Sequence, residues 1–161
     1  MKAALAKSPD IKVVGEVYGE WTESVAQKQV ASILPGLPKV DGVIGQGGDE
    51  YGALQAFQAA GNDIPIIIGG NRGNFLKWWS EEKAKNGYKS YSWAANPWSA
   101  ASGLYVAVDL ANGVTGIPNV MIMPALGITQ DMVDDFANLK ADEVASKGYD
   151  HKWIEETYYK K

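Results

Sequence analysis

The residues of this chain that can do chemistry gather in the turns that follow short apolar runs. An acid, Asp49, follows the run 42–45, and an amide and a guanidinium, Asn71 and Arg72, follow the run 64–69. Trp21, Asn96 and Trp98 lie in other turns of this kind, and Trp93 lies at the carboxyl end of the run 90–94. Acids, amides and arginine form hydrogen bonds with hydroxyl or carboxylate groups, whereas an indole covers a flat apolar face. The set therefore suits a polar ligand that also has an apolar face.

The aromatic residues in these turns have two interpretations. Trp21, Trp93 and Trp98 fall at or just after the carboxyl end of a predicted strand, where an indole can pack on the C–H face of a sugar ring. The ring hydroxyls would then bond to the acid, amides and arginine of the same turns. Alternatively, the three indoles cover the edge of the sheet or an interface between domains.

Asp49 lies in the sequence Gly47-Gly48-Asp49-Glu50-Tyr51, which at first sight is similar to a metal-holding signature of nucleotide cyclases. That signature lies on a β-hairpin, whereas here an apolar strand precedes the motif and a predicted helix follows it within three residues. The position favours Asp49 as the N-cap of that helix, an interaction worth about 1 kcal/mol. A ligand contact by the same carboxylate stays open alongside.

The glycine-rich turn 69–74 lies between a strand and a helix, where free N–H groups can hold a phosphate. It lacks the lysine and hydroxyl of a nucleoside-triphosphate loop and the spacing of a dinucleotide fingerprint. Arg72 in this turn is either a ligand contact, because a guanidinium forms paired hydrogen bonds, or a solvated or salt-bridged surface residue.

The side chains that enzymes and metal sites need are sparse. His151 is the only histidine and lies in a charged tail, and the chain has no cysteine. No pair of nucleophile and base is therefore available, and metal ligation would fall to carboxylates that lack calcium-site spacing. We expect a protein that is not an enzyme and holds no metal or other cofactor. Thr129 is the predicted N-cap of a terminal helix whose acids face water, and these acids are Asp131, Asp134, Asp135, Asp142 and Glu143.

The composition narrows the classes of partner. The 161 residues carry 15 Lys and Arg against 19 Asp and Glu, a net charge of −4 without a basic cluster, so no nucleic-acid partner is expected. The longest apolar runs fall far below the roughly 18 residues of a membrane span, so the chain is not expected to span a membrane. At 46% hydrophobic and 21% charged residues, the composition is typical of one globular domain.

Short strands alternate with helical segments along the chain. The predicted strands are 12–17, 42–45, 64–69, 90–94 and 120–124, and the predicted helices are 23–34, 51–60, 74–86 and 99–112. Residues 1–7 are predicted to be the last two turns of a helix, and a short amphipathic helix is predicted in 147–161. The second and third strands are apolar without a period of two, as is typical of strands covered on both faces by helices. We predict an α/β fold: a three-layer, doubly wound, mostly parallel five-stranded sheet of the flavodoxin-like order 2-1-3-4-5. Ligands of such sheets bind beyond the carboxyl ends of the strands.

Four stretches of the chain carry a resemblance to a known family. Residues 13–34 read as a strand, a loop with an aromatic residue at Trp21, and a helix; residues 42–61 carry an Asp-Glu pair and Gly-Ala-Leu-x-Ala. Residues 66–71 are similar to a Val-Val-Gly-Phe-Asp strand end, and residues 127–136 to a Val-Thr-x-Asn-Val-Asp tail. In this order and spacing they resemble the carboxyl-terminal lobe of type I periplasmic sugar-binding proteins, the ribose-binding-like receptors of bacterial ABC importers.

The chain departs from the family pattern at several turn positions. Gly48-Asp49 stands where the family often has Asn-Asp, and Asn71 stands where the family has a ligand-binding Asp. Ala95, followed by Asn96, replaces a common glutamine. The resemblance therefore implies the fold but not the identity of the sugar.

Such receptors have two lobes of similar size that close on their ligand. The resemblance implies that residues 1–161 are one lobe, equivalent to the C-terminal domain, with a terminal helical tail at 129–161 and half of a site for a sugar or polyol. The implied partners are the missing N-terminal lobe and an ABC-transporter permease, and the implied location is the periplasm. A start inside a helix-strand repeat is expected of a fragment, an engineered half or a truncated reading frame, and an exposed lobe surface rich in Trp and Tyr would favour a homodimer.

Two functions from other classes are compatible with the same fold. One is the effector-binding half of a LacI-type transcription regulator, which also needs an upstream helix-turn-helix. The other is a flavodoxin-like domain that binds a phosphorylated cofactor at the turn 69–74. Purified protein with a flavin absorbance would favour the latter.

Overall fold

The computed structural model describes residues 2–5 and 7–159. The chain divides into two compact units, Met1–Ile68 and Gly69–Lys161. The strands are β1 (Gly42–Ile44), β2 (Ile66–Gly69), β3 (Tyr91–Ala94) and β4 (Leu126–Ile128), and they form an open, mostly parallel four-stranded sheet with the order β1-β2-β3-β4. The predicted α/β class is confirmed. The predicted five strands and the order 2-1-3-4-5 are not found among the described residues.

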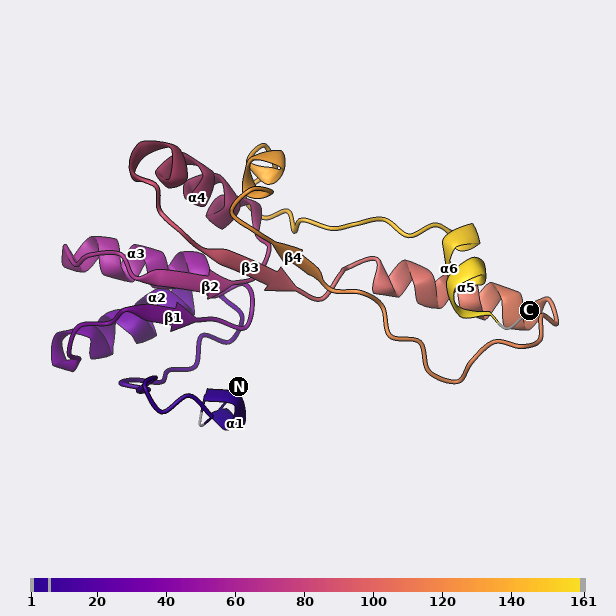
Figure 1. Ribbon diagram of the computed structural model, residues 1–161, viewed down its shortest axis with the longest axis horizontal. Helices are drawn as coiled ribbons and strands as arrows, with labels where there is room; N and C mark the ends of the chain where they lie inside the picture. The colour runs from indigo at the N-terminus through magenta and orange to yellow at the C-terminus, as the bar shows by residue number, and fades with distance from the viewer. Residues whose placement is uncertain (1, 6, 160–161) are drawn as a thin grey trace. The chain divides into compact units, whose positions relative to one another are not determined.

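The first unit places two helices against a parallel strand pair. It contains α1 (Lys2–Leu5), α2 (Glu23–Ile33), the 3₁₀ turn η1 (Leu34–Gly36), β1 and α3 (Glu50–Ala60), and β2 begins at its end. β1 and β2 pair in parallel with Val43 opposite Ile67, and α2 and α3 lie beside them (Figure 1). The core is built from Leu34, Ala56 and Phe57 with Val30, Val40, Val43 and Ile64 packed against them. Burial of these side chains is what holds the helices on the strands.

Helix boundaries follow local signals in the sequence. The C-cap of α3 is Gly61, whose φ of 67° lies in the left-handed region that glycine adopts without strain. Gly52 lies where α2 and α3 approach closely, because a Cβ atom there would overlap the backbone carbonyl of Glu23. The predicted helices 23–34 and 51–60 are confirmed to within one residue at each end.

The predicted strand 12–17 is wrong. These residues are extended but pair with no strand among the described residues, because β1 pairs directly with β2 and no ladder forms on its other side. The prediction that β1 and β2 are covered on both faces is also wrong. Ile44 is 46% exposed and Ile66 is 49% exposed, since α2 and α3 cover the opposite face, on which Val43 lies.

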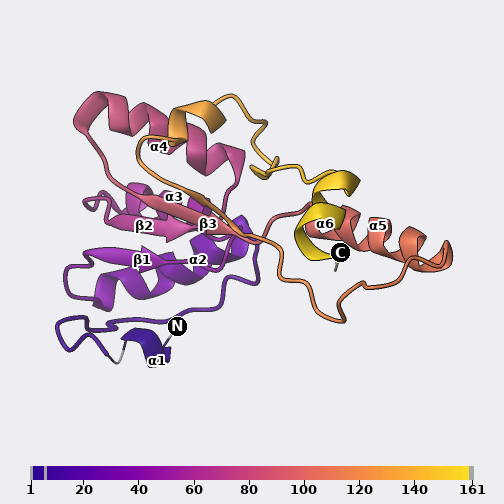
Figure 2. The ribbon, with the colours of Figure 1, turned by 45° about the vertical axis from the view of Figure 1, so that its right-hand side comes forward.

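The second unit contains β3, β4 and the remaining helices. These are α4 (Gly73–Asn86), α5 (Ser99–Ala111), the 3₁₀ turn η2 (Val133–Phe136) and α6 (His151–Tyr158). β3 and β4 are antiparallel with Trp93 opposite Gly127, η2 packs on α4, and α6 packs on α5 (Figure 2). The fully buried side chains of this unit include Phe75, Leu76, Trp79, Ile128, Val133 and Ile154.

Two predictions for the second unit need correction. The last strand is β4 rather than 120–124, and Val120 and Ile122 are exposed, because the chain is paired only from Leu126 onward. The helix expected after Thr129 is only the 3₁₀ turn η2, whose N-cap is Met132. Thr129 Oγ1 instead donates to Asp131 Oδ1 at 2.5 Å, which satisfies the hydroxyl in a local turn.

The ends of the chain are helical in the part that the structure describes. The helix predicted in 1–7 is present as α1, with Met1 and Ala6 outside the described residues. The short amphipathic helix predicted in 147–161 is present as α6, capped by Asp150, whose Oδ1 accepts a hydrogen bond from Trp153 N–H at 2.8 Å. None of the described helices has both the length and the apolar character to cross a membrane.

Candidate functional site

The turn that carries Trp21 has an unusual backbone. Glu20 and Trp21 have φ values of 53° and 51°, in the left-handed region that bulky residues rarely enter. Thr22 N–H donates to Gly19 O at 2.9 Å and Thr22 Oγ1 donates to Glu20 O at 3.0 Å, which holds the turn. Strain of this kind costs about 1–3 kcal/mol per residue and is concentrated at ligand-binding turns. Here its result is an indole that is 66% exposed.

Asp49 lies at the N-cap position of α3, but the predicted cap is wrong. Its side chain makes no capping hydrogen bond, since the carboxylate turns toward the Trp21 turn instead. A Cβ atom on Gly19 would lie 2.8 Å from Asp49 Oδ1. Burial raises the pKa of the Asp49 carboxyl, and hydrogen bonds from the backbone of Gln46 and Thr22 oppose that rise.

Trp21 and Asp49 therefore come together in the first unit. Both line one cavity of about 400 Å³, together with Gly19, Gly45 and Gln46. Asp49 Oδ1 is buried without a hydrogen-bond partner, so it offers an acceptor that a ligand hydroxyl can use. An exposed indole and an unpaired carboxylate oxygen in the lining of one cavity are suited to a sugar ring.

Glu50 is a buried acid that the sequence interpretation passed over. It is 1% exposed, and neither of its carboxylate oxygens has a hydrogen-bond partner. It lies in the first turn of α3, where the positive end of the helix dipole favours a carboxylate. The sequence did contain a signal for the burial of Glu50: it is an acid at the start of a predicted helix that continues with Gly-Ala-Leu-x-Ala, whose named residues are small or apolar.

In the second unit, Asn71 is buried within the protein's own hydrogen bonds. Its Nδ2 donates to Leu126 O at 2.9 Å, and Ser92 Oγ lies 2.8 Å from its Oδ1. The same hydroxyl lies 2.5 Å from Gly70 O, and Ala145 N–H donates to Asn71 O at 2.8 Å. Asn71 thus links the end of β2 to β3, to β4 and to the chain after η2.

The other polar candidates of the second unit lie at the starts of helices. Arg72 is the N-cap residue of α4, is partly buried, and forms a backbone bridge with Val144. Asn96 is buried: its Nδ2 donates to Lys147 O at 2.6 Å and its Oδ1 accepts from Trp98 N–H at 3.1 Å. Asn96 therefore holds the turn before α5 in place.

The two tryptophans of the second unit are in different settings. Trp93 is more than half exposed on β3, opposite Gly127, which has no side chain to cover it. Trp98 is the N-cap residue of α5 and lies near the chain at Gly148, where an added Cβ would be 3.5 Å from the indole. The structure thus offers Trp93 to solvent, and it partly covers Trp98 with the chain's own backbone.

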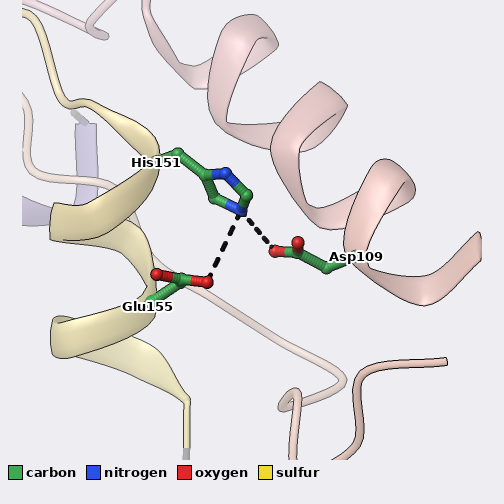
Figure 3. A group of neighbouring side chains, drawn as sticks. All are labelled: Asp109, His151 and Glu155. Carbon is green, nitrogen blue, oxygen red and sulfur yellow. Dashed lines mark hydrogen bonds and ion pairs between the residues drawn. The ribbon is translucent and has the colours of Figure 1, made fainter. Parts of the chain in front are cut away.

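A cluster of titratable groups joins α5 to α6 (Figure 3). His151 Nε2 lies 2.7 Å from Asp109 Oδ2 and 3.9 Å from Glu155 Oε1, and Tyr159 OH also donates to Asp109 Oδ2. Tyr105 stacks on the imidazole with ring centroids 5.0 Å apart. Three ligand atoms of Asp109, His151 and Glu155 lie within 4.8 Å of one another. The 2.7 Å separation is that of a hydrogen bond, so the arrangement is a charge-assisted link between the two helices.

This link predicts a pH dependence. The hydrogen bond to Asp109 raises the pKa of His151 above its ordinary 6.5, and the bonds from Tyr159 and His151 lower the pKa of Asp109 below 3.8. The His151 contribution to stability is therefore complete below pH 6.5 and is lost as the pH rises through its raised pKa. Glu155 and Asp150 act on the imidazole in the same direction as Asp109.

His151 is the only histidine, so its proton NMR signal can be titrated without ambiguity. We expect a midpoint above 6.5, and a midpoint shifted downward in Asp109→Asn, since the amide cannot attract the imidazolium. Glu155→Gln, which removes only the more distant acid, is the matched control and should change the midpoint less. Equal midpoints in the chain and in Asp109→Asn would contradict the link.

Residues 1–115 match the model of a family described as a periplasmic binding protein domain. The chain is also similar to the solved structure of an ABC transporter solute binding protein from Thermobispora bispora, at 34% identity with a TM-score of 0.85. That similarity covers 98% of this chain and 48% of the other.

More distant structures share the fold. An ABC transporter periplasmic solute binding protein from Actinobacillus succinogenes with bound D-allose is 19% identical, with a TM-score of 0.67 over 83% of this chain and 47% of the other. An ABC transporter solute binding protein from Agrobacterium vitis with bound D-fucose is 14% identical, with the same TM-score over 83% of this chain and 45% of the other. The chain spans about half the length of the structures that it matches. By its fold and by the family match over residues 1–115, the chain belongs to the periplasmic binding protein domain family.

Proposed function

We propose that this chain is a lobe of a bacterial ABC-importer solute receptor and that it forms one wall of a sugar-binding site. The observation that carries the proposal is the Trp21 turn: a strained backbone exposes an indole, the same turn approaches the carboxylate of Asp49 at Gly19, Asp49 Oδ1 is buried and unpaired, and both residues line one cavity. Membership of the periplasmic binding protein domain family supports it, and so do the sugars in the distant structures of the same fold. The family match does not favour the LacI-type or flavodoxin-like alternatives.

Each candidate residue has a role in this proposal. Trp21 stacks on the C–H face of the ring, and Asp49 accepts a hydrogen bond from a ring hydroxyl. In the second unit, described by itself, Arg72, Trp93 and Trp98 are the proposed ligand contacts. Asn71 and Asn96, whose amides already bond within the protein, position the turns that carry them.

The proposed activity is binding without catalysis. The ligand is a sugar or polyol, and the partners are an N-terminal lobe, which encloses the ligand from the other side, and an ABC-transporter permease. The proposed location is the periplasm, in keeping with the extracytoplasmic role of the family. A second copy of this chain, bound through exposed Trp and Tyr side chains, is a further proposed partner. Light scattering over a concentration series would detect the homodimer as an increase in molecular mass.

One wall of the site alone is expected to bind a sugar weakly, because half of the contacts and the enclosure of the ligand are absent. Each loss of about 1.4 kcal/mol in binding free energy lowers the affinity tenfold. Calorimetry of this chain with D-allose, D-fucose and a panel of pentoses and hexoses is expected to give no dissociation constant tighter than about 1 mM, near −4 kcal/mol. Micromolar binding by the chain alone would contradict the half-site.

The Trp21 contact can be tested directly by NMR. On titration with the best sugar of the panel, we expect the indole N–H signal of Trp21 to move while that of the fully buried Trp79 stays fixed. Trp21→Ala should weaken binding about tenfold, as expected for losing a stacked indole worth about 1.4 kcal/mol. Leu104→Ala removes an exposed apolar side chain that does not line this cavity and is the control. Equal affinities of the chain and Trp21→Ala would remove Trp21 from the site.

A further inference from the structure

The link between α5 and α6 is built from side chains that also bind metal ions. Asp109 is the only charged residue in the sequence of α5, yet it is 4% exposed. A buried carboxylate has to be paired with another group or bound to a metal ion. His151 and Glu155 of α6 lie beside it, so two helices bring together one imidazole and two carboxylates (Figure 3). Imidazole nitrogen and carboxylate oxygen are common ligands of zinc.

The hydrogen bonds of this group do not account for Glu155. His151 and Tyr159 both donate to Asp109 Oδ2, so the buried acid is already paired. Glu155 Oε1 lies 3.9 Å from His151 Nε2, which is too far for a hydrogen bond. Nevertheless, the three ligand atoms of Asp109, His151 and Glu155 lie within 4.8 Å of one another. The imidazole nitrogen therefore faces two carboxylates but bonds to one, whereas a metal ion would use both.

The sequence spacing and the packing hold these ligands in place. His151 and Glu155 are four residues apart in α6, so their side chains lie on one face of the helix. Tyr105 of α5 stacks on the imidazole with an angle of 10° between the ring planes, which orients the ring. Tyr159 OH donates to the Asp109 carboxylate, and ligating carboxylates usually have an outer-shell contact of this kind. All three ligands are thus oriented by the fold itself.

A small movement separates this arrangement from a tetrahedral site. Two ligand atoms that lie about 2.0–2.1 Å from a zinc ion at the tetrahedral angle are roughly 3.3 Å apart. His151 Nε2 lies 2.7 Å from Asp109 Oδ2 and 3.9 Å from Glu155 Oε1, so one separation must grow and the other must shrink. Rotation of the imidazole toward Glu155 changes both separations in the required direction. The side chains of His151 and Glu155 are 39% and 49% exposed, which leaves room for a water molecule as the fourth ligand.

The ligand types select the class of metal. Calcium and magnesium take oxygen ligands, so an imidazole between two carboxylates disfavours them. Zinc accepts imidazole together with carboxylate, and two carboxylates balance the charge of a divalent ion. The chain has one histidine and no cysteine, so a metal ion that needs an imidazole or a thiolate has one place to bind.

We infer that Asp109, His151 and Glu155 bind one divalent transition-metal ion of the zinc class, which fastens α6 to α5. The ion takes the place of the proton between His151 and Asp109, and that proton passes to water. Because the ion binds the folded protein, it stabilises the second unit, whether or not a sugar binds. The sequence alone placed His151 in a charged tail, since Asp109 lies 42 residues away in the chain.

The first test is a calorimetric titration of the chain with zinc at one fixed pH, after dialysis against a chelator. We expect one ion per chain with a dissociation constant below about 100 μM, which is weaker than the four-ligand sites of zinc fingers. In ¹⁵N NMR spectra of the imidazole, Nε2 of His151 should be the nitrogen that binds zinc, since it faces both carboxylates. Weaker binding, or binding through Nδ1, would overturn the inference.

Glu155→Gln separates a metal site from the hydrogen-bonded link. The variant keeps the hydrogen bond between His151 and Asp109, so its melting temperature in the presence of a chelator should equal that of the original chain. Its zinc affinity should fall at least about tenfold, because the loss of even an outer-shell contact has that effect. Glu156→Gln is the matched control, since it removes an exposed acid of α6 that pairs with Lys152 and lies outside the group. Equal zinc affinities of the two glutamine variants would overturn the inference.

Two further measurements test the other ligands. Asp109→Asn should also bind zinc at least about tenfold more weakly, and unchanged affinity would exclude Asp109 and with it the inferred fastening of α6 to α5. Because Asp109 is buried, this variant is expected to be less stable even in a chelator, and the exposed Glu155 supplies the test that does not depend on folding. Magnesium at the same concentration should not displace zinc. Displacement would indicate a site of oxygen ligands alone and would overturn the role of His151.

Discussion

Replacing Gly52 by alanine is expected to lower the free energy of unfolding by about 3 kcal/mol, the upper range for forcing a methyl group into a packed site. The added Cβ would overlap the backbone carbonyl of Glu23 and lie 3.0 Å from Gln27 N. These are backbone atoms of α2, so no side chain can rotate away, and the two helices must separate. Urea unfolding followed by far-ultraviolet circular dichroism measures the loss.

Gly103→Ala is the matched control for that substitution. Gly103 also lies inside a helix, α5, and a Cβ there meets no atom within 4 Å. Alanine is a better helix former than glycine, so this variant should gain roughly 0.5–1 kcal/mol. If the two alanine variants changed stability equally, the close approach of α2 and α3 would not be the reason for Gly52.

The Gly52 contact also positions the candidate site. α2 begins directly after the Trp21 turn, and α3 begins directly after Asp49. The close approach of these helix starts is what brings Gly19 against the Asp49 carboxylate. Separation of α2 and α3 should therefore move Trp21 away from Asp49. We expect Gly52→Ala to lose the sugar-induced NMR shifts of Trp21 even under conditions in which circular dichroism still shows helical structure.

Apart from the helix expected after Thr129, which is only the 3₁₀ turn η2, the helices were predictable from the sequence because their signals are local. Gly61 and Gly87 end α3 and α4 in the left-handed conformation, and both positions follow a run of helical period. Strand pairing depends on residues that are far apart in the sequence, and the predictions of the strands 12–17 and 120–124 were wrong. Segment 12–17 has the composition of a strand, but composition cannot show whether a partner strand lies beside it.

The candidate site was predictable as a set of turns but not as a set of contacts. The position of Trp21 after an extended run marked it for exposure, whereas its left-handed backbone is visible only in three dimensions. Asp49 had the spacing of an N-cap, but the neighbouring turn offered backbone hydrogen bonds that compete with the helix end. Glu50, next to it, is more deeply buried than a charged residue of its type is expected to be.

Asn71→Leu is expected to destabilise the protein by roughly 2–4 kcal/mol, because it leaves buried polar partners without their hydrogen bonds. Leu126 O would lose the donor that now lies 2.9 Å away, and Ser92 Oγ would lose the acceptor at 2.8 Å. For a chain of this size that corresponds to a fall in melting temperature of roughly 5–15 °C. Asn119→Leu, at an exposed asparagine of the same unit, is the control and should change stability by no more than about 0.5 kcal/mol.

The Asn71 variant separates two roles that the sequence could not distinguish. As a positioning residue, Asn71 should couple to Ser92, so the double variant with Ser92→Ala should lose less stability than the sum of the single variants. As a direct ligand contact, its replacement would abolish sugar-induced shifts while leaving the melting temperature near that of the original chain. The side chain is 1% exposed with both amide atoms bonded inside the protein, which favours the first outcome. The buried amide of Asn71 would then hold the turn that precedes α4 in its conformation. Arg72, the N-cap residue of α4, would be the residue of this turn that can contact a ligand.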